Sequence, residues 1–588
     1  MNHPLEGILA SGLLVQTTLA HVLRQRAAQH ADQTAYVFLT DGASDAHSMT
    51  WGQVDARAAA LAAALRERGA GGKRILLALP SGLPFIESLF ACWYAGAAAV
   101  PVSLPRHQRT RHRLDRIIAH AQADFAIADD EARQRICTDD DGTGNRMVWI
   151  SPRESEGLQK CEPCIEEISP ASTAIIQYTS GSTGMPRGVV VTHASLLHNS
   201  AQIAQACGHD QESTIAGWLP LFHDMGLVGL VIQAAFSGAR CVLMPPERFL
   251  MRPWLWLEMI SNYKVCSSPA PNFAYDLCVD RVSDEQKVRL DLSGWRNALN
   301  GSEPVRARTL DRFAAAFEQC GFRRTSFFPC YGLAEATLFV TGPGANRNIV
   351  RRTTDGESVS DGENSAHIGC GQSYGGTRLA IVDPQTCEAL PARSIGEIWI
   401  AGPSCAAGYW NDTQTSAATF NARLRGSSDA PSWLRTGDLG FIADEQLFIT
   451  GRLRELIIIA GRNHFPVDLE TAAEAAEREV VAPSAVAALS VEIDGLERLI
   501  LLAEVRRELV RTARAAQTHS FDADAVRRRL RAAIAAEHDV VPHEIVLLCP
   551  GALPRTTSGK ISRAAASTAY LNKTLEQFGE TSHVADGN

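Results

Sequence analysis

The chain has no long apolar run, no excess of basic residues and no leader-like beginning. Its longest apolar segment, from Ser88 to Leu104, contains Gly96 and Pro101 and is too short to cross a bilayer comfortably. The residues after Met1 carry no basic cluster, which argues against a secretory signal peptide. A formal net charge of -9 provides no basic surface for a nucleic acid. We therefore expect a cytoplasmic protein without a transmembrane segment and without a nucleic-acid partner.

The 14 cysteines show no disulfide framework, because their spacing is irregular. Reduced thiols are the ordinary state of cysteine in the cytoplasm. The CxxC pair, Cys161 and Cys164, has no second pair to complete the four ligands that a structural zinc site normally needs. We expect neither a disulfide scaffold nor a structural zinc site.

The length predicts more than one domain, since 588 residues exceed what a single hydrophobic core usually supports. A composition of 45% hydrophobic and 21% charged residues is ordinary for a globular protein. Between residues 18 and 128, apolar positions at helical spacing alternate with short apolar runs such as Arg74–Pro80 and Phe125–Ala128. Strands that alternate with helices predict a parallel sheet covered by helices. Residues 129–170 are polar and irregular, and we expect a surface connection there.

A loop rich in Ser, Thr and Gly is predicted between two strands, in Tyr178–Gly188. Its backbone N–H groups can approach an anion closely because glycine has no Cβ, and its hydroxyls add further donors. The loop differs from the GxxxxGK[ST] nucleotide loop, because its basic residue, Arg187, follows a proline. A polar surface turn is the simpler interpretation of such a segment taken alone. The candidate phosphate-binding residues are Thr179, Ser180, Gly181, Ser182, Thr183 and Gly184.

Three later stretches end a predicted strand with small or polar residues. They cover residues 215–224, which include His223 and Asp224, and residues 295–304 and 326–335. Ligands of an open parallel sheet bind at the carboxyl ends of its strands, so these positions are candidates for a site. A lone His–Asp pair is more often a structural hydrogen bond than a catalytic one. We expect residues 269–275 to form a loop that enters a helix.

Three single residues fit the chemistry of a nucleotide. Tyr331 can lie flat against a purine. Glu335 suits a Mg²⁺ that bridges phosphates, because Mg²⁺ prefers oxygen ligands and commonly takes one or two carboxylates. An acid favoured by a helix N-terminus is the structural alternative for Glu335. Asp438, in a glycine turn, can accept hydrogen bonds from both hydroxyls of a ribose, although such turns are common without any ligand.

The fold class predicted from these patterns is α/β. We expect a large N-terminal domain over residues 1–452, built from stacked, mostly parallel sheets with helices. An inserted loop over about 341–367 and a small β subdomain over about 370–450 belong to this domain. Residues 453–588 predict a smaller, mobile α+β domain of ordinary domain size. It carries Lys560 in a glycine-flanked turn, a kind of turn that is usually solvated.

Taken together and in this order, these stretches resemble the adenylate-forming superfamily of acyl ligases, peptide synthetase adenylation domains and luciferases. Within it, several segments are similar to those of the fatty acyl-AMP ligases, and the resemblance covers nearly the whole chain. The segments are Gln177–Thr183, Trp218–Leu227, Pro271–Cys278, Cys330–Thr337 and Gly461–Pro466.

The resemblance implies that ATP and Mg²⁺ are the cofactors and that Lys560, His223 and Glu335 are the catalytic residues. Lys560 would reach the reacting carboxylate and the α-phosphate, and Glu335 would carry Mg²⁺. His223 would line the junction of the acyl and nucleotide pockets. The residues that the resemblance implies for binding ATP are Thr179, Ser180, Gly181, Ser182, Thr183, Gly184, Gly301, Ser302, Tyr331, Gly332, Asp438 and Arg452.

The resemblance also implies a reaction. A medium or long chain fatty acid would be activated to an acyl adenylate with release of pyrophosphate. The acyl group would then pass to the phosphopantetheine thiol of a holo acyl carrier protein, acting in trans, for lipid, polyketide or lipopeptide biosynthesis. Because a fatty carboxylate is already ionised at neutral pH, the reaction needs cationic neutralisation rather than a general base.

Two alternatives to this reaction stay open. The first is a fatty acyl-CoA ligase, because the segment between Glu335 and Gly369 is short beside the insertion typical of acyl-AMP ligases. The second is a catalytically silent acyl-binding or nucleotide-binding protein that keeps the fold. The presence of Glu335, Asp438 and Lys560 argues against the second.

Overall fold

The computed structural model describes most of the chain. The described residues are 17–41, 45–105, 108–137, 147–155, 165, 167–179, 186–344, 348–353, 357, 359, 367–426, 432–459, 462–493, 496–516, 521–556 and 559–578. Within them, no helix is both long enough and apolar enough to cross a membrane.

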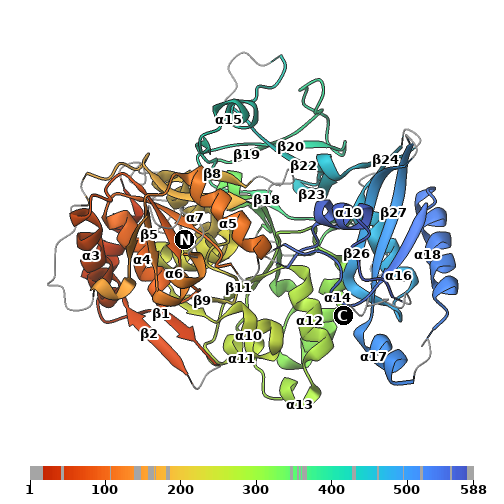
Figure 1. Cartoon of the computed structure of the whole chain (residues 1–588), viewed down its shortest axis with the longest axis horizontal. Coiled ribbons are helices and arrows are strands. Elements are labelled where there is room, and N and C mark those ends of the chain that lie inside the picture. Colours follow the sequence, from red (N-terminus) through yellow and green to blue (C-terminus); the bar gives the residue numbers. More distant parts are fainter. Residues whose placement is uncertain are drawn as a thin grey trace, which may run out of the picture.

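In the described part of the chain, two large sheets stand next to each other in the N-terminal part (Figure 1). The first sheet is parallel except for its edge pair β1–β2. Its strands, in spatial order, are β13 (Phe327–Pro329), β12 (Asn297–Asn300), β11 (Ser267–Ala270), β9 (Thr214–Gly217), β10 (Arg240–Leu243), β1 (Thr34–Leu39) and β2 (Ala46–Thr50).

The second large sheet is parallel at one end and antiparallel at the other. Its strands, in spatial order, are β21 (Gly408–Tyr409), β8 (Arg187–Thr192), β7 (Thr173–Thr179), β4 (Ala98–Pro101), β3 (Arg74–Ala78), β5 (Phe125–Ala128) and β6 (Val148–Ile150). Helix α4 (Leu83–Tyr94) packs between strands of both sheets and is almost wholly buried, as its apolar sequence predicts.

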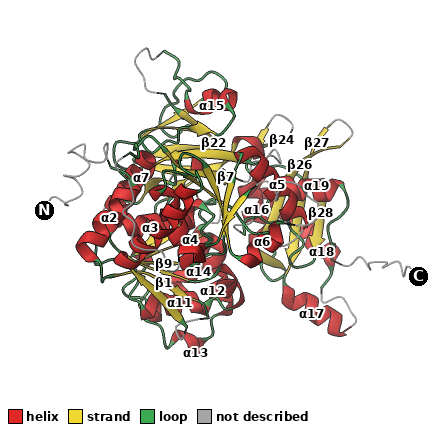
Figure 2. Ribbon diagram, turned by 60° about the vertical axis from the view of Figure 1, so that its left-hand side comes forward, coloured by secondary structure: helices red, strands yellow, loops and turns green. Residues whose placement is uncertain are grey.

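Further helices cover the two sheets (Figure 2). They are α2 (Leu19–His30), α3 (Trp51–Glu67), α5 (Gln108–Ala121), α6 (Asp130–Ile136), α7 (His193–Cys207), α8 (Asp224–Gly226), α9 (Gln233–Ser237), α10 (Pro246–Met251), α11 (Trp254–Asn262), α12 (Asn272–Arg281), α13 (Asp284–Lys287) and α14 (Ala307–Phe317). A π-helical turn, Leu227–Ile232, joins α8 to α9.

Small antiparallel sheets follow the large ones along the chain. One contains β14 (Tyr331–Gly332), β15 (Phe339–Gly342) and β18 (Gln372–Ser373), and a second pairs β16 (Arg351–Arg352) with β17 (His367–Ile368). A third contains β19 (Arg378–Val382), β20 (Gly396–Ala401), β22 (Leu434–Ala443) and β23 (Gln446–Arg452), with helix α15 (Thr413–Phe420) beside it.

The residues after β23 build hydrophobic cores of their own, at the right of Figure 1. Side chains alternate across a strand, so Val486 and Ala488 pack against α16 and α18 while Ala487 and Leu489 pack on the face that carries α19. The elements are β24 (Ile457–Ile459), β25 (Arg462–His464), α16 (Pro466–Ala476), β26 (Val481–Ile493), β27 (Leu496–Val505), α17 (Arg507–Ala516), α18 (Ala523–His538), β28 (Glu544–Leu548) and α19 (Arg563–Leu571).

The predicted α/β fold class is confirmed, but two local predictions are wrong. The stretch 129–170 is not wholly irregular, because Asp129 caps α6 by accepting a hydrogen bond from Ala132 N, and β6 extends the second sheet. Residues 269–270 lie in strand β11 rather than in a loop. Pro269 is in register with Leu299 of β12, so it lies within the ladder although proline cannot donate a backbone hydrogen bond.

Candidate active site

A cavity of about 960 Å³ lies where the carboxyl ends of several strands face the C-terminal part of the chain. Strand β7 ends at Thr179, and the residues directly after β12 and β13 are Gly301 and Cys330. Open α/β sheets bind their ligands at this end of their strands. The predicted site residues that line the cavity are Thr179, His223, Ser302, Tyr331, Gly332, Glu335, Asp438, Arg452 and Lys560.

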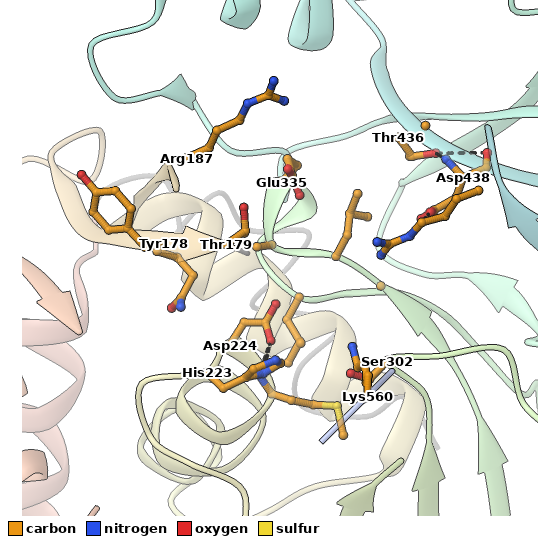
Figure 3. A pocket seen from close by; sticks show the side chains of 18 of the residues that line it. Tyr178, Thr179, Arg187, His223, Asp224, Ser302, Glu335, Thr436, Asp438 and Lys560 are labelled. Atoms are coloured by element: carbon orange, nitrogen blue, oxygen red, sulfur yellow. Dashed lines mark hydrogen bonds and ion pairs between the residues drawn. The ribbon is translucent and has the colours of Figure 1, made fainter. Parts of the chain in front are cut away.

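Asp438 is held between two partners on one side of the cavity. The hydroxyl of Tyr331 donates to Asp438 Oδ2 over 2.7 Å, and Arg452 Nε donates to Oδ1 over 3.2 Å. Burial, and then the charge of Asp438, raises the pKa of Tyr331, so its hydroxyl stays protonated and keeps donating. The same negative charge raises the pKa of Arg452. The result is a fixed carboxylate with Thr436 beside it, whose Oγ1 accepts from Asp438 N (Figure 3).

Glu335 is a buried carboxylate at another wall of the same cavity (Figure 3). Burial raises its pKa, and a 2.9 Å hydrogen bond from the hydroxyl of Tyr409 acts in the opposite direction. The guanidinium of Arg187 lies over the Tyr409 ring, 5.5 Å from its centroid. Burial disfavours the ionised carboxylate of Glu335, and a cation bound beside it would stabilise that ionised form.

Nδ1 of His223 and Oδ1 of Asp224 lie 2.6 Å apart, and both residues line the cavity (Figure 3). Burial alone would raise the pKa of Asp224, but the charge and hydrogen bond of His223, the charge of Lys560 and a hydrogen bond from the backbone N–H of Met225 together hold that pKa below its usual range. Burial lowers the pKa of Lys560, and the charges of Glu303 and Asp224 oppose that shift. Lys560, from the C-terminal part of the chain, thus lies near two acidic residues of the N-terminal part, Asp224 and Glu303.

The backbone around Lys560 fits closely against the N-terminal part. Gly559 has a φ of +85°, and a Cβ at this position would lie 2.9 Å from the ring of Phe273. The lysine is therefore not in the solvated turn that its sequence context alone would favour. The backbone N–H of Thr556 donates to the Lys560 carbonyl over 2.7 Å, which closes the turn.

Two glycines near the cavity are required by close backbone contacts. A Cβ on Gly332 would lie 1.8 Å from the carbonyl oxygen of Leu338, and one on Gly301 would lie 2.9 Å from that of Cys330. Gly301 is not itself among the lining residues, but it places Ser302, which lines the cavity with a φ of +75°.

Some predicted positions lie outside the described residues. These are most of the phosphate loop, Ser180, Gly181, Ser182, Thr183 and Gly184, and the pair Cys161 and Cys164. The flanks of the loop are described: Thr179 and Arg187 are the paired ends of strands β7 and β8.

The structure adds site residues that sequence reasoning missed. Tyr409 reaches Glu335 from a sequence distance of 74 residues. The negative charge of Glu303 raises the pKa of Lys560. Oε1 of Glu303 is buried and has no hydrogen-bond partner in the described part of the chain. Glu303 directly follows Ser302 in the predicted 295–304 stretch, so its position was a usable signal. Tyr409 had none, because only the pairing of β21 with β8 brings it to the site.

An apolar arm extends from this polar region into the interior. Its lining includes Phe222, Met225 and Gly229, and a Cβ on Gly229 would lie 3.4 Å from the side chain of Leu338. Further apolar lining residues are Ile203, Ile215, Leu299 and Phe339. The cavity therefore joins a charged compartment to a space suited to a hydrocarbon chain.

Residues 23–410 match the family described as AMP-binding enzyme. The chain is 40% identical to a medium-chain-fatty-acid–[acyl-carrier-protein] ligase, JamA, of Moorena producens, with 96% of each chain covered. It is 34% identical to the long-chain-fatty-acid–AMP ligase FadD26 of Mycobacterium marinum, over 94% of this chain and 97% of that one.

A solved structure is also similar over almost the whole length. It is the fatty acyl-adenylate ligase from L. pneumophila in complex with acyl adenylate and pyrophosphate, with 31% identity, a TM-score of 0.71, and 96% of this chain and 98% of that chain covered. The family match, the full-length relatives and the fold agree with the cavity described above. The chain belongs to the AMP-binding enzyme family, among the fatty acyl-AMP ligases of the adenylate-forming superfamily.

Proposed function

We propose that the protein activates a medium or long chain fatty acid as its acyl adenylate and passes the acyl group to a holo acyl carrier protein. The observation that carries this proposal is the shared cavity, in which Lys560 of the C-terminal part meets Glu335 and Asp438 beside an apolar arm. The similarity to fatty-acid–[acyl-carrier-protein] ligases supports the same reaction.

In the first step, an oxygen of the fatty carboxylate attacks the α-phosphorus of ATP, and the bond to pyrophosphate breaks. Both reactants are anions, so their mutual repulsion is the main obstacle. We assign Lys560 the task of neutralising the carboxylate and the α-phosphate together, because it is the one lysine among the described residues that line the cavity. The neighbouring acids Glu303 and Asp224 favour its charged form.

The nucleotide would lie on the other side of the cavity. Asp438 is oriented by Tyr331 and Arg452, so its carboxylate can accept from the ribose hydroxyls. Ser302, Tyr331 and Gly332 would face the adenine, and the loop that starts at Thr179 would hold the phosphates. His223 lies between this region and the apolar arm, where the two substrates meet.

Glu335 fits a magnesium ion. It is a buried carboxylate whose pKa is raised by burial. Among the described residues, no group of three or more His, Cys, Asp or Glu side chains could hold a metal ion. Mg²⁺ is commonly held by one or two carboxylates together with phosphate oxygens, so a lone carboxylate is sufficient. When bound, the ion would supply positive charge to the phosphates of ATP. Tyr409 would keep Glu335 in place for this role.

Residues 453–588 would act as a lid domain over the domain of residues 1–452. Lys560 enters the cavity from the lid, so lid closure would complete the site and exclude water from the acyl adenylate. In the second step, the phosphopantetheine sulfur would attack the acyl carbon, AMP would leave, and the thiol proton would be released. The carrier protein would act in trans. Reduced cysteines would fit a cytoplasmic enzyme.

The test has two stages. Pyrophosphate exchange into ATP that depends on added fatty acid establishes adenylate formation, and its absence for every acid would leave only a silent binding protein. The adenylate is then offered to coenzyme A or to a holo carrier protein, with the apo carrier protein as control. We expect the thioester on the holo carrier protein. A thioester formed preferentially on coenzyme A would instead identify a fatty acyl-CoA ligase.

A further inference from the structure

The apolar arm of the cavity follows one face of the first sheet. Pro269 of β11 is in register with Leu299 of β12, and both residues line the cavity. Nearer the amino ends of the strands, Ser267 of β11 is in register with Ile215 of β9, and both of these also line it. Because residues two apart on a strand share a face, the arm runs along the strands towards their amino ends.

Apolar side chains enclose the arm opposite these strands. Ile203 of α7 and Phe339 of β15 line the cavity and belong to one hydrophobic cluster, against which Leu299 and Leu338 pack. Helix α7 ends at Cys207, one turn after Ile203. The end of this helix and the amino ends of β11 and β12 are joined by hydrogen bonds.

Four buried side chains carry these hydrogen bonds, and we call them the end wall: His209, Gln233, Ser267 and Asn297. Ser267 Oγ lies 2.7 Å from Nε2 of His209 and accepts a 2.6 Å hydrogen bond from the side-chain amide of Asn297. The same amide donates to the carbonyl of Cys207 over 2.9 Å. The side-chain amide of Gln233 lies 3.3 Å from Nδ1 of His209. All four side chains of the end wall belong to residues at most 2% exposed.

The polar groups of the end wall can satisfy one another. With the oxygen of the Gln233 amide towards Nδ1, the His209 ring donates to Gln233 and accepts at Nε2 from Ser267, whose oxygen accepts from Asn297. Burial is the largest cause that lowers the pKa of His209 to about 3, so the ring is neutral at physiological pH. In this arrangement the end wall needs no further partner, and a methyl group can rest against it.

A chain that is too long would have to open the end wall. Parting Ser267 from His209 or Asn297 would leave buried polar groups unpaired, and each such group lowers an equilibrium constant by a factor of about five or more. Forcing extra methylene groups into a closely packed space also costs free energy. The end wall therefore sets a sharp limit to the length of a hydrocarbon chain in the arm.

The length of the arm follows from the strands. Strand β11 extends from Ser267 to Ala270, where the polar compartment begins beyond its carboxyl end, and a strand of this length covers roughly 10 Å. A fully extended chain of single bonds advances about 1.2 Å per bond, so this distance takes about eight bonds. With the carboxyl carbon and its neighbour in the polar compartment, the arm fits about ten carbons.

We propose that the end wall restricts the acyl substrate to a medium chain of about ten carbons, and that acids of sixteen or eighteen carbons are excluded. This inference rests on the proposed function, since it assigns the arm to the acyl chain. It narrows that function from medium or long chains to medium chains, and it assigns the restriction to His209 and Ser267, the two members of the end wall that line the cavity.

The test measures fatty acid-dependent pyrophosphate exchange with saturated acids of four to eighteen carbons, each below the concentration at which it forms micelles. We expect kcat/KM to rise about fourfold with each added methylene up to about ten carbons, because each one buries further apolar surface. Acids of fourteen carbons or more should then be at least about tenfold poorer than the best acid, because they would have to open the end wall.

Two variants move the limit in opposite directions. His209→Ala removes the ring from the end wall and should shift the best chain length upwards by about two to four carbons. Ile215→Phe fills space in front of the end wall and should shift it downwards. His198→Ala is the matched control, because Nδ1 of His198 lies 2.9 Å from Ser404 Oγ in a His–Ser pair that does not line the cavity. It should keep the wild-type limit.

The outcomes separate the proposed function from the chain-length limit. If no acid supports exchange, the proposed function fails. If acids of sixteen carbons are used as well as those of ten, the limit is refuted while the function stands. A wild-type limit that neither variant moves also refutes the role of the end wall. Should His209→Ala fail to fold, the wild-type profile and Ile215→Phe decide the question.

Discussion

Arg306 of the N-terminal part donates from Nη1 to both carboxylate oxygens of Glu474 on α16, over 2.9 and 3.0 Å. Both side chains are largely buried, with exposed fractions of 16% and 8%. The same nitrogen also donates to Ser484 Oγ over 3.2 Å. These contacts join the two parts of the chain in the arrangement that brings Lys560 into the cavity. We therefore expect Arg306 to act as a positioning residue for the proposed lid.

Replacing Arg306 with alanine should lower fatty acid-dependent pyrophosphate exchange by roughly tenfold or more. Removing one partner of a buried ion pair leaves the other uncompensated, which costs about 3–5 kcal/mol, and only the closed arrangement bears that cost. Arg312→Ala is the matched control, because Arg312 lies on helix α14, which Arg306 directly precedes, and pairs with Asp276 and Asp280 of the N-terminal part. Equal losses in both variants would show a general loss of stability instead.

Replacing Lys560 with alanine should reduce adenylate formation by about a hundredfold or more, because a preorganised charge at the reacting atoms is lost. Binding of ATP should change much less, since the contacts proposed for the ribose and adenine remain. Exchange kinetics give the rate, and equilibrium binding gives the affinity. Lys573→Ala, an exposed lysine of the same lid, is the control. Adenylate formation at the normal rate in Lys560→Ala would refute the proposed mechanism.

Tyr331→Phe keeps the ring but removes the hydrogen bond that orients Asp438. Hydrogen bonds to charged groups contribute about 1.5–3 kcal/mol, so we expect KM for ATP to rise by about tenfold with a smaller change in kcat. Tyr374→Phe removes a comparable hydroxyl, which donates to the Pro343 carbonyl outside the cavity, and should leave KM for ATP unchanged. A purely catalytic loss with normal KM in Tyr331→Phe would contradict the role assigned to Asp438.

Asp468, in the first turn of α16, makes the stability of the lid depend on pH. Burial, and then the charge of Glu470, raises its pKa to about 7. This pKa is above the value near 4 that an aspartate has in the unfolded chain. The contribution of Asp468 to the free energy of unfolding is therefore fully present below about pH 4 and is lost as the pH rises through about 7. Asp468→Asn should therefore stabilise the lid at pH 8.5, by on the order of 1–3 kcal/mol, and much less at pH 5.

Thermal unfolding of Asp468→Asn and of the wild-type protein at pH 5 and pH 8.5 measures this difference. Asp524→Asn provides the control, because Asp524 is exposed on α18 of the same lid. A gain in melting temperature that does not depend on pH would show that the asparagine stabilises the lid through another cause.

The sequence predicted the parts of the site that depend on local order along the chain. Thr179, Ser302 and Tyr331 follow or end buried strands, and a parallel sheet brings such positions to one edge. The partners that orient the site were not predictable in this way. Tyr409 meets Glu335 only because β21 pairs with β8, and Arg306 meets Glu474 only across the lid contact.

Local fold errors have similar causes. Helix α6 and the edge strand β6 each have few buried residues. The residues of 129–170 that form them therefore show only a weak apolar periodicity, and the sequence did not predict these two elements. Strand β11 contains Pro269, a residue that sequence rules keep out of central strands. In both cases the pairing of distant segments overrode the local preference of the residues.

The close approach of Gly559 to Phe273 has a consequence for how the lid stops. A Cβ at residue 559 would lie 2.9 Å from a ring carbon of Phe273, so closer approach of the proposed lid at this point is limited by atomic overlap and not by charge. Such a limit does not weaken with salt, whereas the attraction between exposed charges does. We therefore expect the depth to which Lys560 enters the cavity to change little with ionic strength.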